Sequence, residues 1–415
     1  ADVYTSATRE LLERNHRAMK HLIQTMVGED RISFEDYVCD DGRGFGPYRI
    51  KCTMWREGDR VILDFDGTDP QSESSINFYL NENMFKMFFG IYMIMVFDPQ
   101  ILFNDGFYDL VEVRIPDGSL LKPKFPAALS CRTHALGRIF DVLGGLLGQR
   151  TPEFLNAAGF SSSPHLMFSG FDQSGEWFQL FQIGFGGIPG RPLGDGPDGH
   201  SLWPGFTNVP NEFLERYFPL RIEHYETVAD SGGAGLHRGG NAISMAYRFL
   251  ESGTISIHDD RWFTYPWGVN GGKPGMRSTK YIVRADGTRE ILGAKVDDVA
   301  VHDGDVLSYI TWGGGGWGNP LDRDPGLVAL EVKRGLVTRD GAKDNYGVVL
   351  GDDGGVDADA TRTLRDRMGE DINRNEIFNF GPSIDELRAS CEAETGLPAP
   401  KPPVWKRRYG AVAAQ

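Results

Sequence analysis

The sequence predicts an α+β protein: a mixed N-terminal region with a hairpin and buried helices, followed by a mostly antiparallel β domain and short C-terminal helices. Apolar residues recur at helical spacing near the N-terminus. After residue 220, short alternating segments are separated by DG turns. After residue 320, capping residues precede two short helical patterns. The 415 residues are enough for two or three folding units.

The N-terminal part mixes helical and strand patterns. Ser6 is a candidate cap for an amphipathic helix, and the apolar run MFKMFFGIYMIMVF contains a lysine and is too short to cross a bilayer. We therefore expect the run to be a buried helix. The elements expected here are a helix over residues 6–27, a hairpin around REGDR, a helix over residues 82–97, a strand at DLVEVRI and a helix from Thr133 to about Leu147.

The C-terminal part is dominated by short strands. Six segments predict antiparallel strands: RIEHYETV, ISMAYRFL, TISIHD, KYIVRA, REILGA and VLSYITW. Two capped helices should follow Pro320, and then a charged segment that is typical of an extended surface arm. The expected division is an N-terminal helix (1–30), an α+β core domain (31–219), an antiparallel β domain (220–318), a helical pair (319–350) and an extended C-terminal arm (351–415).

Composition disfavours several classes of partner. The chain has 43 basic and 58 acidic side chains, a net charge of -15, and no long basic cluster to approach a phosphate backbone. Its four cysteines show no CxxC spacing, which indicates reduced thiols rather than a disulfide scaffold or a zinc knuckle. The first residues do not resemble a secretory signal. We expect a cytoplasmic protein with no nucleic-acid or membrane partner.

Two glycine-rich stretches raise the question of phosphate binding. TWGGGGWGNP, residues 311–320, lacks the lysine and hydroxyl of a P-loop, so a tight turn with close backbone packing is favoured, with Asn319 capping a helix that begins at Pro320. SGGAGLHRGG, residues 231–240, lacks the order of a dinucleotide fold. It is interpreted as a glycine-rich hairpin with an exposed Arg238, a weak anion-binding candidate.

Three polar clusters are candidates for chemistry. LDFDGTDP contains Asp66 and Thr68 and could bind a hard cation, although a strand end leading into a turn is favoured. The segment GDGPDGHSLWPGFTNVPNEFLE gathers many polar side chains in a loop and is the best functional candidate. HDDRW ends a strand, and its Asp-Arg pair is more often structural. No GxSxG, HExxH or Cys-His signature identifies a nucleophile.

Several stretches together resemble the hydantoinase B family: DFDGTDPQSESSIN, PDGSLLKPKFP, DSGGAGLHRGG, WGVNGG, GGGGWGNPLDRDP and GLVTRDGAKDNYGVV. That family includes the B subunits of ATP-dependent hydantoinases, the corresponding part of 5-oxoprolinase, and the large subunits of acetone and acetophenone carboxylases. The resemblance runs in consistent order from about Ile32 to Leu350. It implies that the glycine run is a family hallmark and not a Walker loop.

The resemblance also implies partners. Family members usually carry a further N-terminal half with metal-binding His and Asp residues, which nothing here matches. The divalent metal (Zn, Mn or Fe) is therefore expected on a partner chain carrying that half, and ATP and Mg on a hydantoinase A-type subunit. No cofactor is expected on this chain alone. ATP would phosphorylate a carbonyl or enolate oxygen of a small ketone or cyclic amide before carboxylation or hydrolysis.

On this reading the chain shapes the substrate cavity and bridges subunits. Eight residues are expected to line the cavity, with no acid, base or nucleophile assigned: His200, Asn208, Glu212, Asp66, Thr68, Arg238, Asp259 and Arg261. Three functions stay open. The chain is a subunit of an ATP-dependent ketone carboxylase of the acetone or acetophenone type, a subunit of an ATP-dependent amidohydrolase acting on hydantoins, 5-oxoproline or lactams, or a non-catalytic scaffold.

Overall fold

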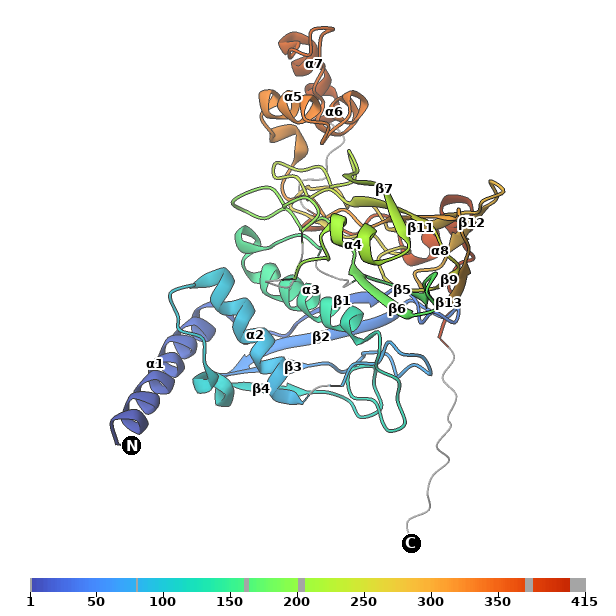
Figure 1. The fold of residues 1–415 in the computed structure, drawn as a ribbon. Coiled ribbons are helices and arrows are strands. Elements are labelled where there is room, and N and C mark those ends of the chain that lie inside the picture. The colour runs from blue at the N-terminus through green and yellow to red at the C-terminus, as the bar shows by residue number, and fades with distance from the viewer. Residues whose placement is uncertain (1, 80, 160–163, 201–205, 370–375, 404–415) are drawn as a thin grey trace.

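The computed structural model describes residues 2–403 except 80, 160–163, 201–205 and 370–375. It has the α+β architecture predicted from the sequence, with helices and mostly antiparallel sheets (Figure 1). In the described part of the chain, no helix combines the length and the apolar character needed to cross a bilayer.

The first sheet follows the order β1-β2-β3-β4, antiparallel except for the parallel pair β3 and β4. The predicted hairpin forms its centre, because Ile50, Cys52 and Met54 alternate onto one buried face of β2. The elements of this part are α1 (Asp2–Met26), β1 (Ile32–Val38), β2 (Tyr48–Glu57), β3 (Arg60–Asp64), α2 (Glu82–Phe97), η1 (Asp105–Leu110), β4 (Val111–Arg114), α3 (Arg132–Arg150) and η2 (Pro152–Phe154).

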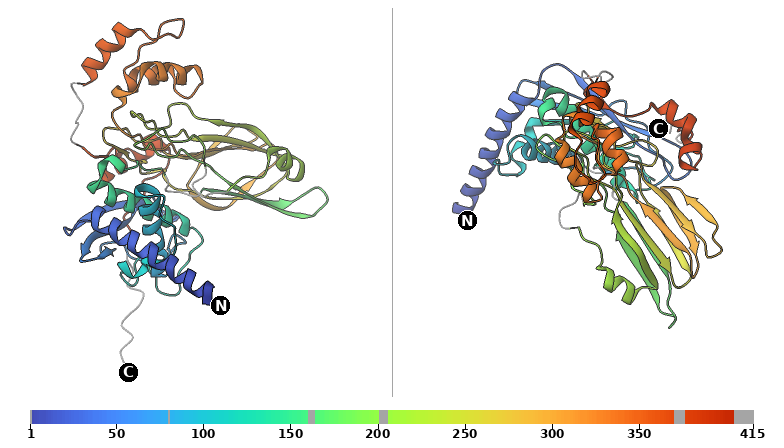
Figure 2. Two further views of the ribbon diagram at one scale, coloured as in Figure 1. Left: turned by 90° about the vertical axis from the view of Figure 1, so that its left-hand side faces the viewer. Right: turned by 90° about the horizontal axis from the view of Figure 1, so that it is seen from above.

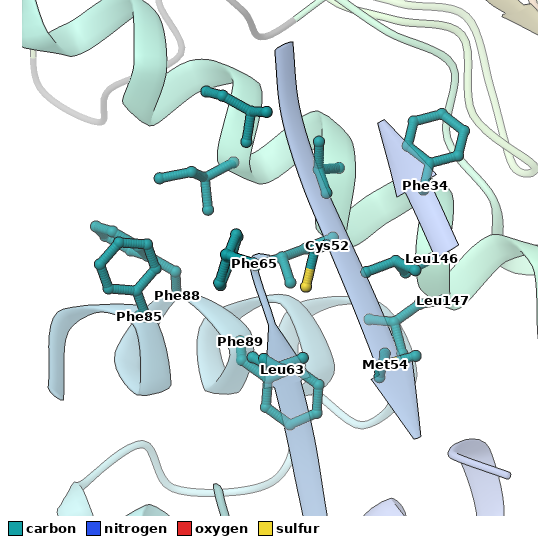
Figure 3. Close-up of a cluster of buried hydrophobic side chains, with 14 of the residues drawn as sticks. Phe34, Cys52, Met54, Leu63, Phe65, Phe85, Phe88, Phe89, Leu146 and Leu147 are labelled. Atoms are coloured by element: carbon teal, nitrogen blue, oxygen red, sulfur yellow. The ribbon is translucent and has the colours of Figure 1, made fainter. Parts of the chain in front are cut away.

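Helices α2 and α3 cover this sheet and complete its core. The Asn81 side chain caps α2 by accepting a hydrogen bond from the backbone N–H of Met84. Phe85 and Phe89 of α2 are almost fully buried and face strand side chains such as Leu63 (Figure 3). The apolar run is therefore a core helix, as expected.

Helix α1 is only partly packed. Its second half buries an apolar stripe that includes Met19, Leu22 and Ile23. The first half projects from the body of the molecule (Figures 1 and 2), and Tyr4 is 78% exposed and Leu11 is 45% exposed. The same side of the helix is thus covered at one end and open at the other.

The C-terminal sheets form a sandwich. One sheet has the order β12-β11-β14-β8-β7 and the other β13-β9-β5-β6, and all pairs are antiparallel. Buried side chains such as Phe168, Phe249, Ile257 and Leu307 form the core. The elements are β5 (His165–Phe171), β6 (Trp177–Ile183), α4 (Asn211–Tyr217), β7 (Leu220–Thr227), β8 (Ile243–Phe249), β9 (Gly253–His258), β11 (Thr279–Val283), β12 (Arg289–Leu292), β13 (Lys295–Val301) and β14 (Val306–Ile310).

Two features of the sandwich differ from the expectation. Strands β5 and β6 precede residue 220, but β5 pairs with β9 and β6 pairs with β5, so one sheet contains strands from both sides of that position. Strand β13 was not predicted, because the adjacent Asp297 and Asp298, which lie at a register shift between Val296 and Val299, interrupt the apolar alternation.

Glycine-rich segments lie between the two parts. Segments 186–190, 232–240, 268–275 and 313–318, which we call the glycine bundle, are joined by backbone hydrogen bonds such as that from the N–H of Gly314 to the carbonyl of Gly240, 2.9 Å. A Cβ atom on Gly315 would lie 2.0 Å from the Trp267 carbonyl oxygen. The expected close backbone packing is therefore present, and it requires glycine.

The C-terminal elements begin as predicted. The Asn319 side chain caps η3 (Pro320–Asp322) by accepting a hydrogen bond from the N–H of Leu321, 2.9 Å. The two expected helices are α5 (Pro325–Lys333) and α6 (Arg339–Tyr346). Figure 1 shows these helices at one end of the molecule.

The segment expected to be an extended arm contains regular structure. It forms α7 (Ala358–Gly369), α8 (Ile384–Thr395) and β15 (Phe378–Asn379), which pairs with β10 (Gly268–Val269). Ser383 and Glu386 form a capping box at the start of α8. Leu387 and Cys391 pack against Trp262 and Phe263. Burial of this small apolar face therefore holds α8 in place, although most of the surrounding sequence is charged.

Candidate functional site

A cavity of about 580 Å³ lies between α2, α3 and the glycine bundle. Its volume is in the range of small-molecule sites. The apolar lining comes largely from α2, and Phe140 of α3, Pro189, Ala157 and Trp267 also contribute to it. The polar residues of the lining include Tyr92, Asp141 and Asn156. The cavity thus suits a ligand that is mainly apolar and has a polar end.

The polar end has a defined electrostatic character. Burial raises the pKa of Tyr92, the nearby Asp141 carboxylate raises it further, and a hydrogen bond with the Asn156 side chain opposes these effects. Tyr92 therefore keeps its proton at neutral pH and can donate it in a hydrogen bond. Asp141 accepts hydrogen bonds from Arg261, 3.0 Å, and Arg138, 3.3 Å.

Asp141 belongs to a larger cluster, the buried ion network, which consists of Asp36, Arg138, Asp141, Asp260, Arg261 and Lys295. Arg261 donates to Asp36 at 2.7 Å, Arg138 donates to Asp260 at 2.6 Å, and Lys295 lies 3.0 Å from Asp260. All six residues are at most 8% exposed. Each of the three cations is paired with a carboxylate, which is how charges can be held in a protein interior.

The charges of the network support one another. Burial alone would raise the pKa of Asp36, but Arg261 and Arg138 hold it below its ordinary value. Burial likewise opposes ionisation of Asp260, and Lys295 and Arg138 outweigh it, so that its pKa is lowered. Burial would lower the pKa of Lys295, whereas Asp260 and Asp40 raise it above the ordinary value. Asp36, Asp260 and Lys295 are therefore charged at neutral pH.

The network joins the two parts of the molecule. Asp36 lies on β1, Arg138 and Asp141 lie on α3, and Arg261 follows β9 with φ 55°, in the left-handed region. The indole N–H of Trp267 donates to Asp36 at 3.0 Å while the residue lines the cavity. The cavity wall is therefore fixed by the same carboxylate that binds Arg261.

The HDDRW prediction falls beside this site. Arg261 is a member of the network, and Asp259 is fully buried and forms an ion pair with Lys280. Neither residue is part of the cavity lining. Arg261 forms an ion pair with the cavity residue Asp141 and thereby helps to hold this side chain in the cavity wall.

The remaining predicted residues lie elsewhere. The N–H of Asp66 donates to Asp64 at 3.0 Å, and the hydroxyl of Thr68 donates to the carbonyl of Lys51 at 3.0 Å, hydrogen bonds typical of the favoured turn. Arg238 is buried, not exposed as expected, because it forms ion pairs with Asp198 and Glu331.

The candidate loop is only partly described, since residues 201–205 lie outside the described residues. His200 is exposed, and Glu212 is exposed in the first turn of α4. The side chain of Asn208 binds both the N–H and the carbonyl of Ile183, at 2.8 and 2.6 Å, and so ties the loop to β6. The cavity roles expected of these residues stay predictions.

The sequence interpretation missed the residues at the centre of the site. Arg138 and Asp141 are three residues apart in the otherwise apolar helical pattern RIFDVLGG. Charged residues on the apolar face of a helix are rarely buried without a partner, and that pattern was the available signal. In the described ranges, no group of three or more His, Cys, Asp or Glu side chains is arranged to hold a metal ion.

The fold and the site define an α+β protein with a ligand-sized apolar cavity beside a buried ion network. The chain belongs to the hydantoinase B/oxoprolinase family, whose model matches residues 1–320. It is 27% identical over 376 residues to a putative D-/L-hydantoinase B subunit of Pseudomonas sp. strain NS671, covering 88% of this chain and 63% of that protein.

Other relatives agree with this assignment. The chain is 25% identical to the caprolactamase beta subunit of Pseudomonas jessenii, over 88% of this chain and 64% of the relative. Its fold matches a nucleotide-free acetone carboxylase with a TM-score of 0.74 and 21% identity, covering 92% of this chain and 57% of the other. The ATP-dependent caprolactamase structure matches with the same TM-score, at 24% identity, over 88% of this chain and 65% of the other. The chain thus spans less than two thirds of these relatives.

Proposed function

We propose that the chain is a subunit of a multi-subunit ATP-dependent ketone carboxylase of the acetone or acetophenone type, in which it shapes the substrate cavity and bridges subunits. The observation that supports this is the cavity of about 580 Å³, whose apolar walls meet a phenol and a carboxylate. The fold likeness to acetone carboxylase supports the same reaction class.

The lining favours an apolar carbonyl compound. The hydrocarbon part of a ketone would pack against α2 and Trp267, and the Tyr92 hydroxyl could donate a hydrogen bond to the carbonyl oxygen. No lysine or arginine is among the described residues that line the cavity, so a substrate carboxylate would have no cationic partner in the lining. A substrate with its own carboxylate, such as 5-oxoproline, is therefore disfavoured in this cavity.

A lactam is the second candidate substrate. It also combines an apolar ring with one carbonyl group, and the fold matches the caprolactamase structure as well as it matches acetone carboxylase. The alternative function is therefore a subunit of an ATP-dependent amidohydrolase. A third possibility is a scaffold whose cavity binds no substrate.

The proposed complex divides the chemistry among chains. ATP and Mg would bind to a hydantoinase A-type subunit, and a divalent metal (Zn, Mn or Fe) to the chain carrying the N-terminal half of a B-type subunit. The relatives are named as a hydantoinase B subunit and a caprolactamase beta subunit, and these names support an assembly of this kind. This chain would contribute the cavity, and the phosphorylation and metal chemistry would occur at its borders with partners.

The test of the reaction is ATP turnover by the reconstituted complex. We expect acetone or acetophenone to stimulate ATP hydrolysis when bicarbonate is present, while caprolactam and hydantoin do not. Stimulation by a cyclic amide without bicarbonate would instead establish the amidohydrolase.

The test of the cavity is a pair of matched substitutions. Ile91→Trp would fill the space beside α2, and we expect at least a tenfold loss in kcat/KM, about 1.4 kcal/mol of transition-state stabilisation. Ile291→Trp introduces the same group on β12, where Ile291 is 36% exposed, and serves as the control. Equal turnover by both variants would favour the scaffold. His200→Ala and Asn208→Ala test the loop in the same assay.

A further inference from the structure

Strand β6 is an edge strand with an open side. Its sheet has the order β13-β9-β5-β6, so β6 pairs only with β5. The Asn208 side chain binds the N–H and the carbonyl of Ile183 from outside this pair, so the backbone of Ile183 faces away from β5. Alternate residues of an antiparallel strand face the same side, and the backbone groups of Trp177, Gln179 and Phe181 therefore also face outward. Within the described residues, these outward groups have no backbone partner.

The sequence of β6 lacks the features that usually protect an edge strand. WFQLFQI contains no charged residue and no proline, and its pairing with β5 has no register shift. Charges and bulges on an edge disfavour pairing with another strand. The other edge strands of the four- and five-stranded sheets all carry charged residues, and two of them, β7 and β13, also contain a register shift: β1, β4, β7, β12 and β13. Strand β6 is therefore suited to accept a further strand.

The outer face of β6 is rich in exposed aromatic side chains. Trp177 is 62% exposed and Phe181 is 49% exposed, and Gln179 lies between them on the same face. Phe171 of β5 lies opposite Trp177 and is 65% exposed. Clustered exposed aromatic side chains are typical of surfaces that contact another protein.

The open edge is complementary to itself. When two copies of β6 pair antiparallel about a two-fold axis at Gln179, this residue faces its own equivalent, and Trp177 faces Phe181 of the second copy. Each outward-facing residue then exchanges both backbone hydrogen bonds with another outward-facing residue. The side chains form an amide pair flanked by aromatic pairs, and such cross-strand pairs stabilise a sheet. Asn208 occupies the edge at Ile183, which leaves an open edge centred on Gln179.

The charge of the chain also favours contact at this strand. The net charge is -15, so two copies repel each other over much of their surfaces. The residues of β6 bring no charge to the contact. The acidic residue that precedes the strand, Glu176, would lie opposite Gln182 of the second copy and not opposite another carboxylate. Two acidic chains can therefore meet here without placing like charges opposite each other.

We propose that two copies of the chain associate through antiparallel pairing of their β6 strands, with Gln179 on the two-fold axis. The four strands β13, β9, β5 and β6 of each copy then form one continuous sheet across the interface. None of the residues in this contact lines the cavity, so the interface does not depend on the proposed function. A complex built on this interface contains two copies of the cavity.

The first test is the mass of the full chain in solution, measured by sedimentation velocity over a range of concentrations. We expect a dimer, and Gln179→Lys should raise its dissociation constant at least tenfold, because two like charges then lie opposite each other. Thr254→Lys is the matched control, since it adds the same charge to an exposed position of β9, away from the edge. A monomer at every concentration, or a dimer that Gln179→Lys does not weaken, would overturn the proposal.

A charge exchange keeps the test decisive if a substitution destabilises the chain. Gln179→Lys and Gln179→Glu should each be monomeric. An equal mixture of the two variants should restore the dimer, because opposite charges then meet at the two-fold axis. Mixing cannot rescue a misfolded chain. If both variants keep the native melting temperature and the mixture stays monomeric, a second copy is not the occupant of this edge.

The register is tested by a disulfide between two copies. The Cα atoms of a hydrogen-bonded antiparallel pair are about 5.5 Å apart, which a disulfide can span. Gln179→Cys should therefore form a covalent dimer under mild oxidation, whereas Phe181→Cys, opposite Trp177 of the second copy, should not. The four native cysteines are buried and provide a low background. A covalent dimer of Phe181→Cys but not of Gln179→Cys would contradict the proposed pairing.

Discussion

Individual side chains decide how firmly the cavity wall is held. Asp141 lines the cavity and accepts hydrogen bonds from Arg138 and Arg261. The same carboxylate therefore contributes to the cavity surface and neutralises buried arginines. Asp36 likewise accepts hydrogen bonds from the cavity residue Trp267 and from Arg261. The wall therefore cannot shift without disturbing buried charges.

Replacing Asp141 tests this link. Asp141→Asn keeps the shape but leaves Arg138 and Arg261 with less negative charge nearby, and breaking a buried pair costs about 3–5 kcal/mol. We expect a loss of that size in the free energy of unfolding, measured by urea denaturation. Asp303→Asn, on an exposed turn, should change it by less than about 0.5 kcal/mol. Equal stability of the two variants would contradict the network.

Protonation of the partly buried His165 should make the fold sensitive to acid. Burial and the charge of His258 lower the pKa of His165 to about 4, against about 6.5 in the unfolded chain. Between these values the unfolded chain binds the proton and the folded protein does not, so stability present above about pH 6.5 is lost as the pH falls toward about 4. His258, whose pKa is raised, acts in the opposite direction.

The measurement is the free energy of unfolding of the native chain and of His165→Gln between pH 7.5 and 4. We expect a flatter curve for His165→Gln, because the variant no longer has an imidazole that titrates differently in the two states. Parallel curves for the two proteins would show that His165 does not contribute.

Among the elements, the glycine bundle is the least tolerant of change. A Cβ atom on Gly315 would overlap the Trp267 carbonyl, and the affected atoms are backbone, which cannot rotate away. Gly315→Ala should therefore cost several kcal/mol or prevent folding. Gly293→Ala is the control, since its Cβ would meet the Val296 side chain at an ordinary 3.5 Å. The melting temperatures of the two variants test the difference.

The elements also show what the sequence could predict. Alternation and DG turns located β7, β8, β9, β11, β12 and β14, and helical spacing located α2 and α3. Strand β13 was missed because its bulge breaks the alternation. Helix α8 was missed because only a few of its residues, such as Leu387, supply the apolar contact, and their partner Trp262 lies far away in the sequence.

At the scale of the whole molecule, the cavity and the buried ion network form only when distant segments pack together, so local sequence patterns cannot predict them. Asp36, Arg138, Asp260 and Lys295 lie on four separated segments and are brought together only by the packing of α3 between the first sheet and the sandwich. The sequence interpretation singled out Arg261 from its HDDRW context. It could not assign Arg261 partners, because charge pairing across more than 100 residues leaves no local signal.

The open end of α1 is our candidate for contact with a partner chain. Tyr4 and Leu11 extend the buried stripe of the helix into solvent. Asn104, next to the cavity residue Phe103, donates to the carbonyl of Leu11, so this surface runs close to the cavity. A partner that covers this surface would lie close to the proposed substrate.

Tyr4→Asp combined with Leu11→Asp should therefore weaken assembly at least tenfold without changing the far-ultraviolet circular dichroism of the isolated chain. Size-exclusion chromatography of the co-expressed subunits would measure the change. The control is Leu193→Asp, at a side chain that is 95% exposed elsewhere on the surface. Loss of assembly in the control alone would place the interface away from α1.

The composition of the glycine bundle has a consequence for how substrate range can diverge. Pro189, Ala157 and Trp267 form a wall that packs on the glycine bundle, and the Trp267 indole is held by its hydrogen bond to Asp36, so this wall has little freedom to adjust to a new ligand. Helix α2 also lines the cavity, and its unbranched Met95 is a flexible side chain. Selection for a larger or smaller carbonyl compound would thus change residues of α2, while the wall beside the glycine bundle keeps its shape for every substrate.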